Sequence, residues 1–139
     1  MDKEEYAATL MFPLGEYHPE FNRYFTGVVY IQPVSDEQIH MSNLTFEPGC
    51  RNHWHVHRAE QGGGQMLLCT GGRGWYQAWG EEAVPMTPGT VVHIPPGVKH
   101  WHGAAKDSWF SHLAIEIEGV NTGADWYDPV SEEEYQKLK

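Results

Sequence analysis

The hydrophobic positions of this chain fall into short runs separated by turn residues. The runs are rich in valine, isoleucine, leucine, threonine and aromatic residues, and glycine or proline stands between them. Short strands bounded by such turn signals are typical of an antiparallel sandwich or barrel. Helical periodicity is nearly absent from the middle of the chain. We therefore predict an all-β fold with strands at residues 26–31, 39–46, 53–57, 65–69, 74–78, 90–94 and 109–117.

Helices are expected only at the two ends. Residues 1–10 carry a weak helical pattern, whereas residues 131–138 have the signals of a helix start and end. Ser131 can cap the first turn, Glu134 stands at the capping-box position, and Lys137 lies near the negative end of the helix dipole. The pattern predicts a short C-terminal helix.

The length of the chain suits a single domain. Its 139 residues show no internal repeat and no low-complexity linker, which is the size of one ordinary globular unit. We divide residues 1–139 into an N-terminal arm (1–25), a barrel whose motifs span 49–104, and a C-terminal tail with the helix (119–139). The tail is expected to pack on the barrel through Trp126 or Tyr127, or to reach a neighbouring subunit.

Charge and cysteine content exclude several classes of function. The net charge is −10, from 19 acidic against 9 basic residues, so a basic surface that tracks nucleic-acid phosphates is not expected. No apolar run is long enough to span a bilayer or to resemble a secretory leader, which predicts a cytoplasmic protein without a membrane partner. Cys50 and Cys69 form no CxxC pair, so a disulfide framework or a thiolate zinc site is not supported.

Histidine is unevenly distributed. Seven of the nine histidines lie between His53 and His112. His55 and His57 are two positions apart, and on a strand this spacing directs both imidazoles to one face. His100 follows a strand and a turn that can return it to the same interior, and Gln65 opens the strand after a glycine turn. Imidazole and amide ligands of this kind suit a divalent first-row metal.

These residues carry a resemblance to the cupins, which are small double-stranded β-helix (jelly-roll) barrels. Gly49, His55 and His57 match the front half of the first cupin motif. The second motif is matched at Gly89, Pro95, Gly97 and His100, with Ala104 where the final asparagine would stand. The resemblance implies a cupin barrel with a metal site formed by both motifs.

The first motif departs from the cupin pattern at its acidic ligand. Glu60 follows His57 one position too early, whereas Gln65 has the motif's spacing to Gly72. An insertion that supplies the glycine turn before Gln65 reconciles both sides of the motif. We therefore expect three histidines and Gln65 around the metal, with Glu60 as the alternative ligand.

A narrower resemblance rests on residues 45–49, 74–75, 99–104 and 112–115. These runs are similar to cupins of the carboxymuconolactone-decarboxylase-like group, which includes bacterial manganese-dependent hydroxynitrile lyases. The resemblance implies a pocket histidine at His112. It also places Glu116 where those lyases have a glutamine. The metal ligands it implies are His55, His57, Gln65 and His100.

The expected function is that of a metal-dependent enzyme acting on a small organic substrate by acid–base, lyase or decarboxylase-type chemistry. His112, with a pKa suited to neutral pH, and Glu116 are the candidate catalytic residues; Glu116 either orients His112 or acts as the base. The metal can be Mn, Fe, Ni or Zn, because nitrogen and oxygen ligands suit all four. Alternatives are an Fe(II)-dependent dioxygenase or isomerase, a non-enzymatic ligand-sensing module, and a structural metalloprotein. The resemblance also implies a homo-oligomer, a dimer or a tetramer.

Overall fold

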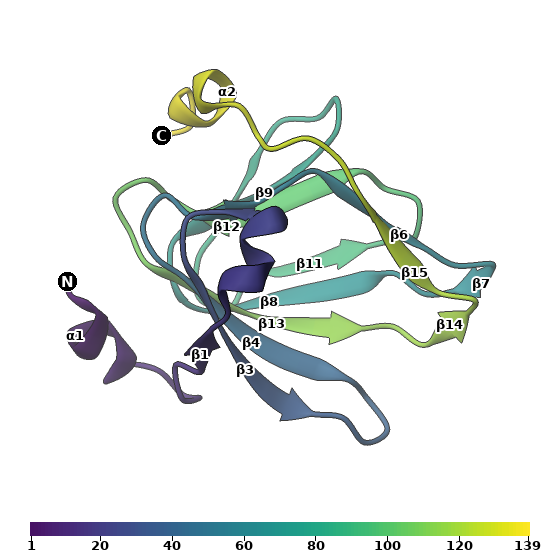
Figure 1. The fold of residues 1–139 in the computed structure, drawn as a ribbon, viewed down its shortest axis with the longest axis horizontal. Coiled ribbons are helices and arrows are strands. Elements are labelled where there is room, and N and C mark those ends of the chain that lie inside the picture. The colour runs from purple at the N-terminus through teal and green to yellow at the C-terminus, as the bar shows by residue number, and fades with distance from the viewer.

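Two antiparallel sheets face each other in the computed structural model, which describes all residues 1–139 (Figure 1). The six-stranded sheet has the spatial order β1 (Glu16–Tyr17), β3 (Val29–Ser35), β4 (Met41–Phe46), β13 (Phe110–Glu116), β8 (Gln65–Gly72) and β11 (Val91–Ile94). The seven-stranded sheet contains β10 (Val84–Met86), β9 (Gly74–Ala78), β12 (His100–Ala104), β5 (Arg51–Asn52) and β2 (Phe25–Thr26), with β6 (His55–Arg58) beside β12 and β15 (Gly123–Trp126) beside β6. Together they form a jelly-roll β-barrel, as the sequence predicts.

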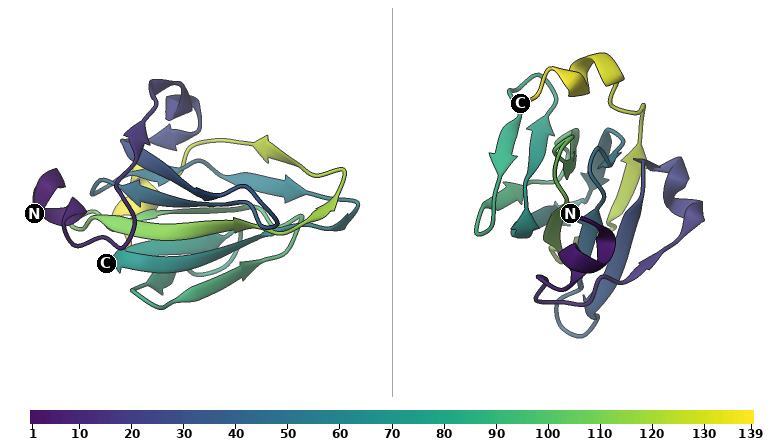
Figure 2. Two further views of the ribbon diagram at one scale, coloured as in Figure 1. Left: turned by 90° about the horizontal axis from the view of Figure 1, so that it is seen from below. Right: turned by 90° about the vertical axis from the view of Figure 1, so that its left-hand side faces the viewer.

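Smaller elements complete the chain. The strands β7 (Gln61–Gly62) and β14 (Gly119–Val120) form a separate two-stranded ladder. The helices are α1 (Lys3–Ala7), a 3-10 helix η1 (Pro19–Arg23) and α2 (Glu132–Gln136). Both termini lie outside the sheets, and α2 stands over one side of the barrel (Figure 2). No helix here has the length and apolar content needed to cross a membrane.

Most predicted strands are found near their expected positions, and one prediction is wrong in an instructive way. The strand predicted at 26–31 is two strands, β2 and β3, which belong to different sheets. Gly27 lies between them with φ +97, a backbone conformation that favours glycine. The hydrophobic pattern does not show this break, because both strands bury residues in the same core. The helix at the N-terminus is confined to Lys3–Ala7 rather than 1–10.

The main core lies between the two sheets. Phe46, Leu67 and Phe110 are fully buried there, and such aromatic and aliphatic side chains supply most of the free energy that favours folding. These residues fill one end of the barrel. The other end, where β6, β8 and β13 carry polar inward residues, is left for the functional site.

The C-terminal segment packs on the outside of the second sheet. Trp54 and Trp101 alternate with inward histidines and are buried outside the barrel with Val130 and Tyr135. Ser131 caps α2 as predicted, its side chain accepting a hydrogen bond from the Glu134 N–H. The tail before this helix forms β15, which pairs with β6 and so stabilises the strand that carries two histidines.

Candidate metal centre

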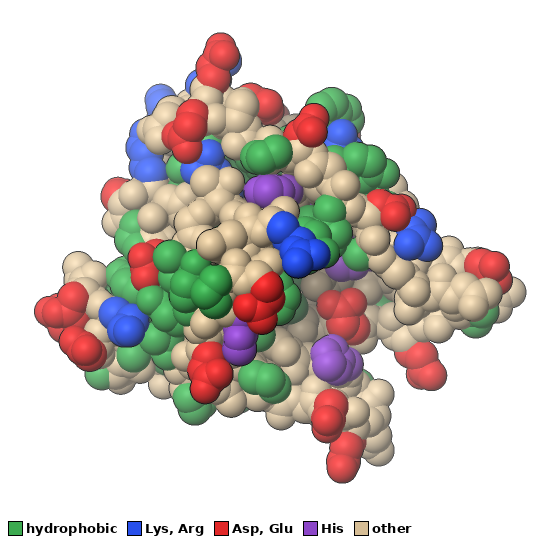
Figure 3. Space-filling model, viewed as in Figure 1, with side chains coloured by type: hydrophobic (Ala, Val, Ile, Leu, Met, Phe, Trp, Pro, Cys, Tyr) green, Lys and Arg blue, Asp and Glu red, His purple; other side chains and the backbone are tan.

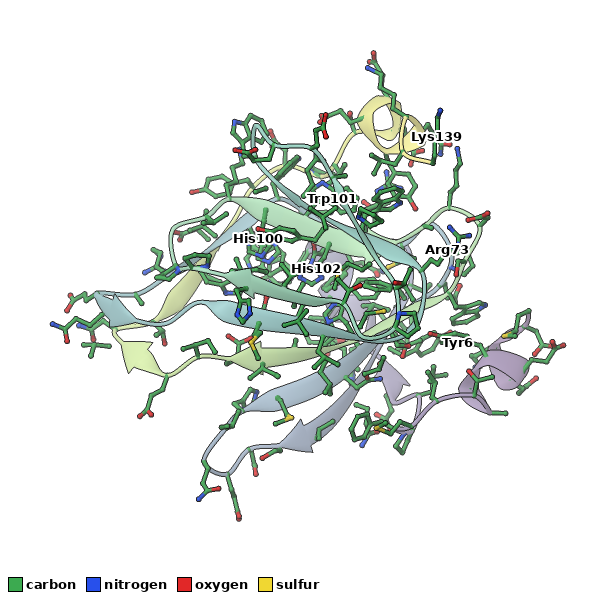
Figure 4. The ribbon with its side chains drawn as sticks, turned by 180° about the vertical axis from the view of Figure 1, so that it is seen from behind. Tyr6, Arg73, His100, Trp101, His102 and Lys139 are labelled. Carbon is green, nitrogen blue, oxygen red and sulfur yellow. The ribbon has the colours of Figure 1, made fainter.

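Strands β6 and β12 bring three histidines together. His55 and His57 share the inner face of β6, and His100 lies directly opposite His55 in the antiparallel ladder. The nearest ring nitrogens of these three residues all lie within 4.8 Å of one another. In Figure 4, His100 and His102 point into the barrel and Trp101 points away from it. The predicted cluster therefore forms from residues of both sequence motifs.

Backbone carbonyls set the orientation of two of these rings. His55 Nδ1 lies 2.8 Å from the His53 carbonyl oxygen, and His100 Nδ1 lies 2.9 Å from that of Val98. Because a carbonyl only accepts, each Nδ1 carries the hydrogen and donates it. Each Nε2 therefore keeps a free lone pair, which is the arrangement found in metal-ligating histidines.

Burial keeps the imidazoles of His55 and His100 neutral. Loss of hydration holds the pKa of His55 well below its usual value and lowers the pKa of His100 to about 4. The Nε2 atoms of His57 and His100 are buried and have no hydrogen-bond partner in the protein. Buried polar atoms are normally paired, so these nitrogens have the properties of ligands for a cation.

Gln65 adds an oxygen to the same end of the barrel. Its side-chain nitrogen donates to Glu116 Oε1 at 2.9 Å, while its Oε1 is buried and has no partner. The alternative ligand, Glu60, is exposed and lines a separate hollow with Pro96 and Asn121. Three imidazole nitrogens and one amide oxygen fit a divalent first-row metal ion.

A cavity of about 810 Å³ opens beside this cluster. His57, Glu116, Glu118 and His40 are among its lining residues. Histidine and acidic side chains border a hollow on this face of the molecule (Figure 3). Its size is in the range of small-molecule sites. Glu116 is therefore at the cavity, and the structure pairs it with Gln65 rather than with His112.

His112 lies deeper in the barrel than Glu116, on the same face of β13. It is fully buried and packs against Phe46 and Phe110, with ring centroids 5.4 Å away in each case. Loss of hydration lowers its pKa to about 4. The expectation of a pKa near neutrality is wrong, because sequence spacing does not reveal how completely a barrel excludes water.

Asn52 and His102 are two buried polar residues to which sequence reasoning assigned no role. Asn52 Oδ1 accepts from the His102 backbone N–H at 2.9 Å, so its amide nitrogen faces the ring, 3.0 Å from His102 Nε2. That ring nitrogen must accept, which leaves the hydrogen on Nδ1. His102 Nδ1 therefore donates to His112 Nε2 at 2.9 Å. The only sequence signal was the position of His102 two residues after His100.

An aromatic stack supports the cluster from the side of the tail. Trp126 lies parallel to the His55 ring, with centroids 4.4 Å apart and an interplanar angle of 20°. Tyr24 also stacks on Trp126, with ring centroids 4.5 Å apart. The tail thus packs on its own barrel through Trp126, one of the two residues predicted for that contact.

Known proteins resemble this chain over most of its length. Residues 42–115 match the model of the Cupin domain. An (R)-mandelonitrile lyase from Granulicella tundricola is 39% identical over 118 residues, which cover 82% of this chain and 87% of that protein. A cupin-like protein from Thermotoga maritima is 36% identical, with a TM-score of 0.79 over 93% of this chain and 96% of the other. A predicted oxalate decarboxylase from Thermotoga maritima, at 17% identity and a TM-score of 0.62, covers 80% of this chain and 95% of the other and shows the fold alone.

Proposed function

This chain belongs to the cupin family, and on that premise we propose that it is a metal-dependent lyase of small hydroxynitriles. The observation that carries the proposal is the group of free ligand atoms at one end of the barrel. Nε2 of His57 and of His100 and Oε1 of Gln65 are all buried without a partner. The similarity to an (R)-mandelonitrile lyase supports the substrate class.

The proposed metal ligands are His55, His57, Gln65 and His100. None of the four brings a negative charge, so a divalent ion held by them keeps its full charge. Such an ion would supply Lewis acidity towards a substrate oxygen. Mn, Fe, Ni and Zn all suit this ligand set. The cavity beside the cluster has room for an aromatic hydroxynitrile and borders the apolar residues Ile39, Ile115 and Ile117.

The proposed reaction splits a hydroxynitrile into a carbonyl compound and hydrogen cyanide. A base takes the hydroxyl proton, the C–O bond becomes a carbonyl, and the carbon–carbon bond breaks with its electron pair going to cyanide. The cyanide ion then takes up a proton and leaves as hydrogen cyanide. Atoms and charge balance without any oxidant or reductant.

Two side chains are proposed to move the proton. His112 is the base of our proposal; its Nε2 lone pair accepts the hydrogen bond of His102, so that hydrogen bond must break before Nε2 can take up the substrate proton. Glu116 lines the cavity, and its second oxygen, Oε2, has no partner within the chain. It is the alternative base and can return the proton to cyanide. His112 is fully buried and does not line the cavity, so a substrate must pass deeper into the barrel than the cavity to reach it.

Elemental analysis followed by an activity assay tests the proposal. The purified protein should contain a divalent transition metal at about one ion per chain. Protein reloaded with that metal should release benzaldehyde from mandelonitrile, and chelation should abolish this activity. His93→Ala is the matched control, because His93 is exposed on β11 and is not one of the three clustered histidines. Metal-loaded protein that leaves mandelonitrile intact would contradict the proposed reaction.

A further inference from the structure

Gln65 presents a chemical ambiguity at the proposed metal site. A glutamine amide has an oxygen, which can bind a cation, and a nitrogen whose two hydrogens face a cation unfavourably. The two ends have nearly the same shape, so packing alone does not distinguish them. A site that uses glutamine as a ligand needs a neighbour that selects the orientation of the amide.

Glu116 is in position to make this selection. It lies directly opposite Gln65 in the ladder between β13 and β8, and its Oε1 is 2.9 Å from the Gln65 side-chain nitrogen. A carboxylate only accepts hydrogen bonds. It therefore attracts the NH₂ end of the amide, and the oxygen of Gln65 turns to the opposite side. That oxygen is buried and has no partner in the protein.

We infer that Glu116 is a positioning residue that holds the Gln65 amide with its oxygen towards the three histidines, and so sets the affinity of the site for its metal. This inference rests on the proposed function, since it concerns the same four ligands. A glutamine at position 116 can donate as well as accept, so it permits either orientation of Gln65.

The carboxylate also compensates for the neutral ligands. Three imidazoles and an amide bring no negative charge to a divalent ion, and Glu116 places one at the far end of the Gln65 amide. A hydrogen bond to a charged group is stronger than one between neutral groups. Glu116 thus acts through Gln65, whatever part it also plays in proton transfer.

Metal titration of Glu116→Gln and Glu118→Gln tests the inference. Glu118 lines the same cavity and its replacement removes the same charge, but the side-chain hydrogen bond of Gln65 goes to Glu116 and not to Glu118. Apo protein is titrated with Mn²⁺, and free Mn²⁺ is followed by electron paramagnetic resonance. Loss of a partner that orients a ligand costs about 10- to 100-fold in affinity. We expect a loss of that size for Glu116→Gln and a change within about threefold for Glu118→Gln, an exposed charge screened by solvent.

A double variant exchanges the positions of the amide and the carboxylate. Gln65→Glu combined with Glu116→Gln puts the carboxylate at the cluster and the amide opposite it, where the amide donates to the new ligand. This pair should bind Mn²⁺ at least as tightly as the unmodified protein, although Glu116→Gln alone does not. The double variant also restores the charge that Glu116→Gln alone removes, so the comparison with Glu118→Gln, and not this rescue, separates orientation from charge.

The outcomes separate the two proposals. If the unmodified protein does not bind Mn²⁺, Co²⁺ or Zn²⁺, the proposed metal site is wrong, and so is this inference. If it binds metal but Glu116→Gln and Glu118→Gln lose affinity equally, or the double variant is weaker than Glu116→Gln, Glu116 does not orient Gln65. In that case the proposed function stands unaffected.

Discussion

The two ends of the barrel interior use the same residue type in opposite ways. At the open end, His55 and His100 donate from Nδ1 to backbone carbonyls and leave Nε2 free. At the closed end, His102 and His112 hydrogen-bond to each other. The first pair is prepared for a ligand from outside the protein, whereas the second pair shares a hydrogen bond and leaves His112 Nδ1 buried without a partner. All four histidines are buried, so burial does not distinguish the two pairs. The hydrogen-bond partners of their ring nitrogens do.

The largest effect is expected at the open end. His100→Ala removes one of three converging imidazoles, and bound metal should fall from about one ion per chain to background, because the remaining ligands no longer surround the ion. Elemental analysis after dialysis measures this. Circular dichroism should show that the β-fold persists. Full metal occupancy in this variant would mean that the open end is not the metal site.

The closed end should respond in stability rather than in metal content. His112→Ala empties a fully buried position and leaves the His102 N–H without an acceptor. We expect a loss of about 2–5 kcal/mol in the free energy of unfolding, measured by urea denaturation of the metal-free protein. Metal content should stay unchanged. Loss of metal from His112→Ala would erase the distinction between the two ends.

The contribution of the closed end to folding stability should also depend on pH. The pKa of His112 is lowered from 6.5 to about 4, so between these values the unfolded chain binds more protons than the folded one. The stability due to neutral His112 is present above pH 6.5 and is lost as the pH falls towards 4. Between pH 7.5 and pH 5 this loss is about 2 kcal/mol.

His112→Phe isolates this contribution, because phenylalanine fills the position without titrating. In urea denaturation of metal-free protein, the stability of the variant should fall less steeply with acid than that of the unmodified chain. The remaining slope comes from the other buried histidines, whose pKa values are also lowered. Parallel curves for the two proteins would show that His112 is not neutral in the folded state.

The smallest effect is expected from the aromatic stack outside the cluster. Trp126→Leu keeps an apolar side chain but removes the ring that lies 4.4 Å from His55. Stacked aromatic pairs contribute about 0.5–1.5 kcal/mol beyond their buried area. Metal affinity measured by titration should therefore fall by about 2- to 10-fold. An unchanged affinity would show that β6 positions His55 without help from the tail.

Much of the fold follows from local pattern. The strand predicted at 74–78 coincides with β9, because an apolar run between two turns fixes both its ends. β10, β12 and β15 were not among the predicted strands, and β15 is short and partly polar. It is a strand because β6 offers it a hydrogen-bonding edge. Pairing partners of this kind do not appear in the hydrophobic pattern of a single segment.

Part of the candidate site, like part of the fold, was predicted from the sequence, and part was not. The spacing of His55 and His57 and the motif around His100 predicted the cluster that the structure brings together. The role of Asn52 and the link between His102 and His112 were not predicted, because the first contact spans 50 residues and the second depends on which strand faces are enclosed. The lowered pKa of His112 has the same origin, since burial is a property of the closed barrel.

The sequence by itself determined the class of the protein: short strands and glycine turns predicted an all-β barrel, and the resemblance of two motifs to those of cupins implied the family. The His-x-His spacing placed two histidines on one face, because side chains alternate along any strand. Only the tertiary structure decided how these residues are partnered. Gln65 and Glu116 are 51 residues apart and meet because β8 and β13 pair in one register. A shift by one residue would turn each inward side chain outward. Register depends on packing of the whole barrel, so the orientation of the Gln65 amide belongs to the fold and not to any segment of the chain.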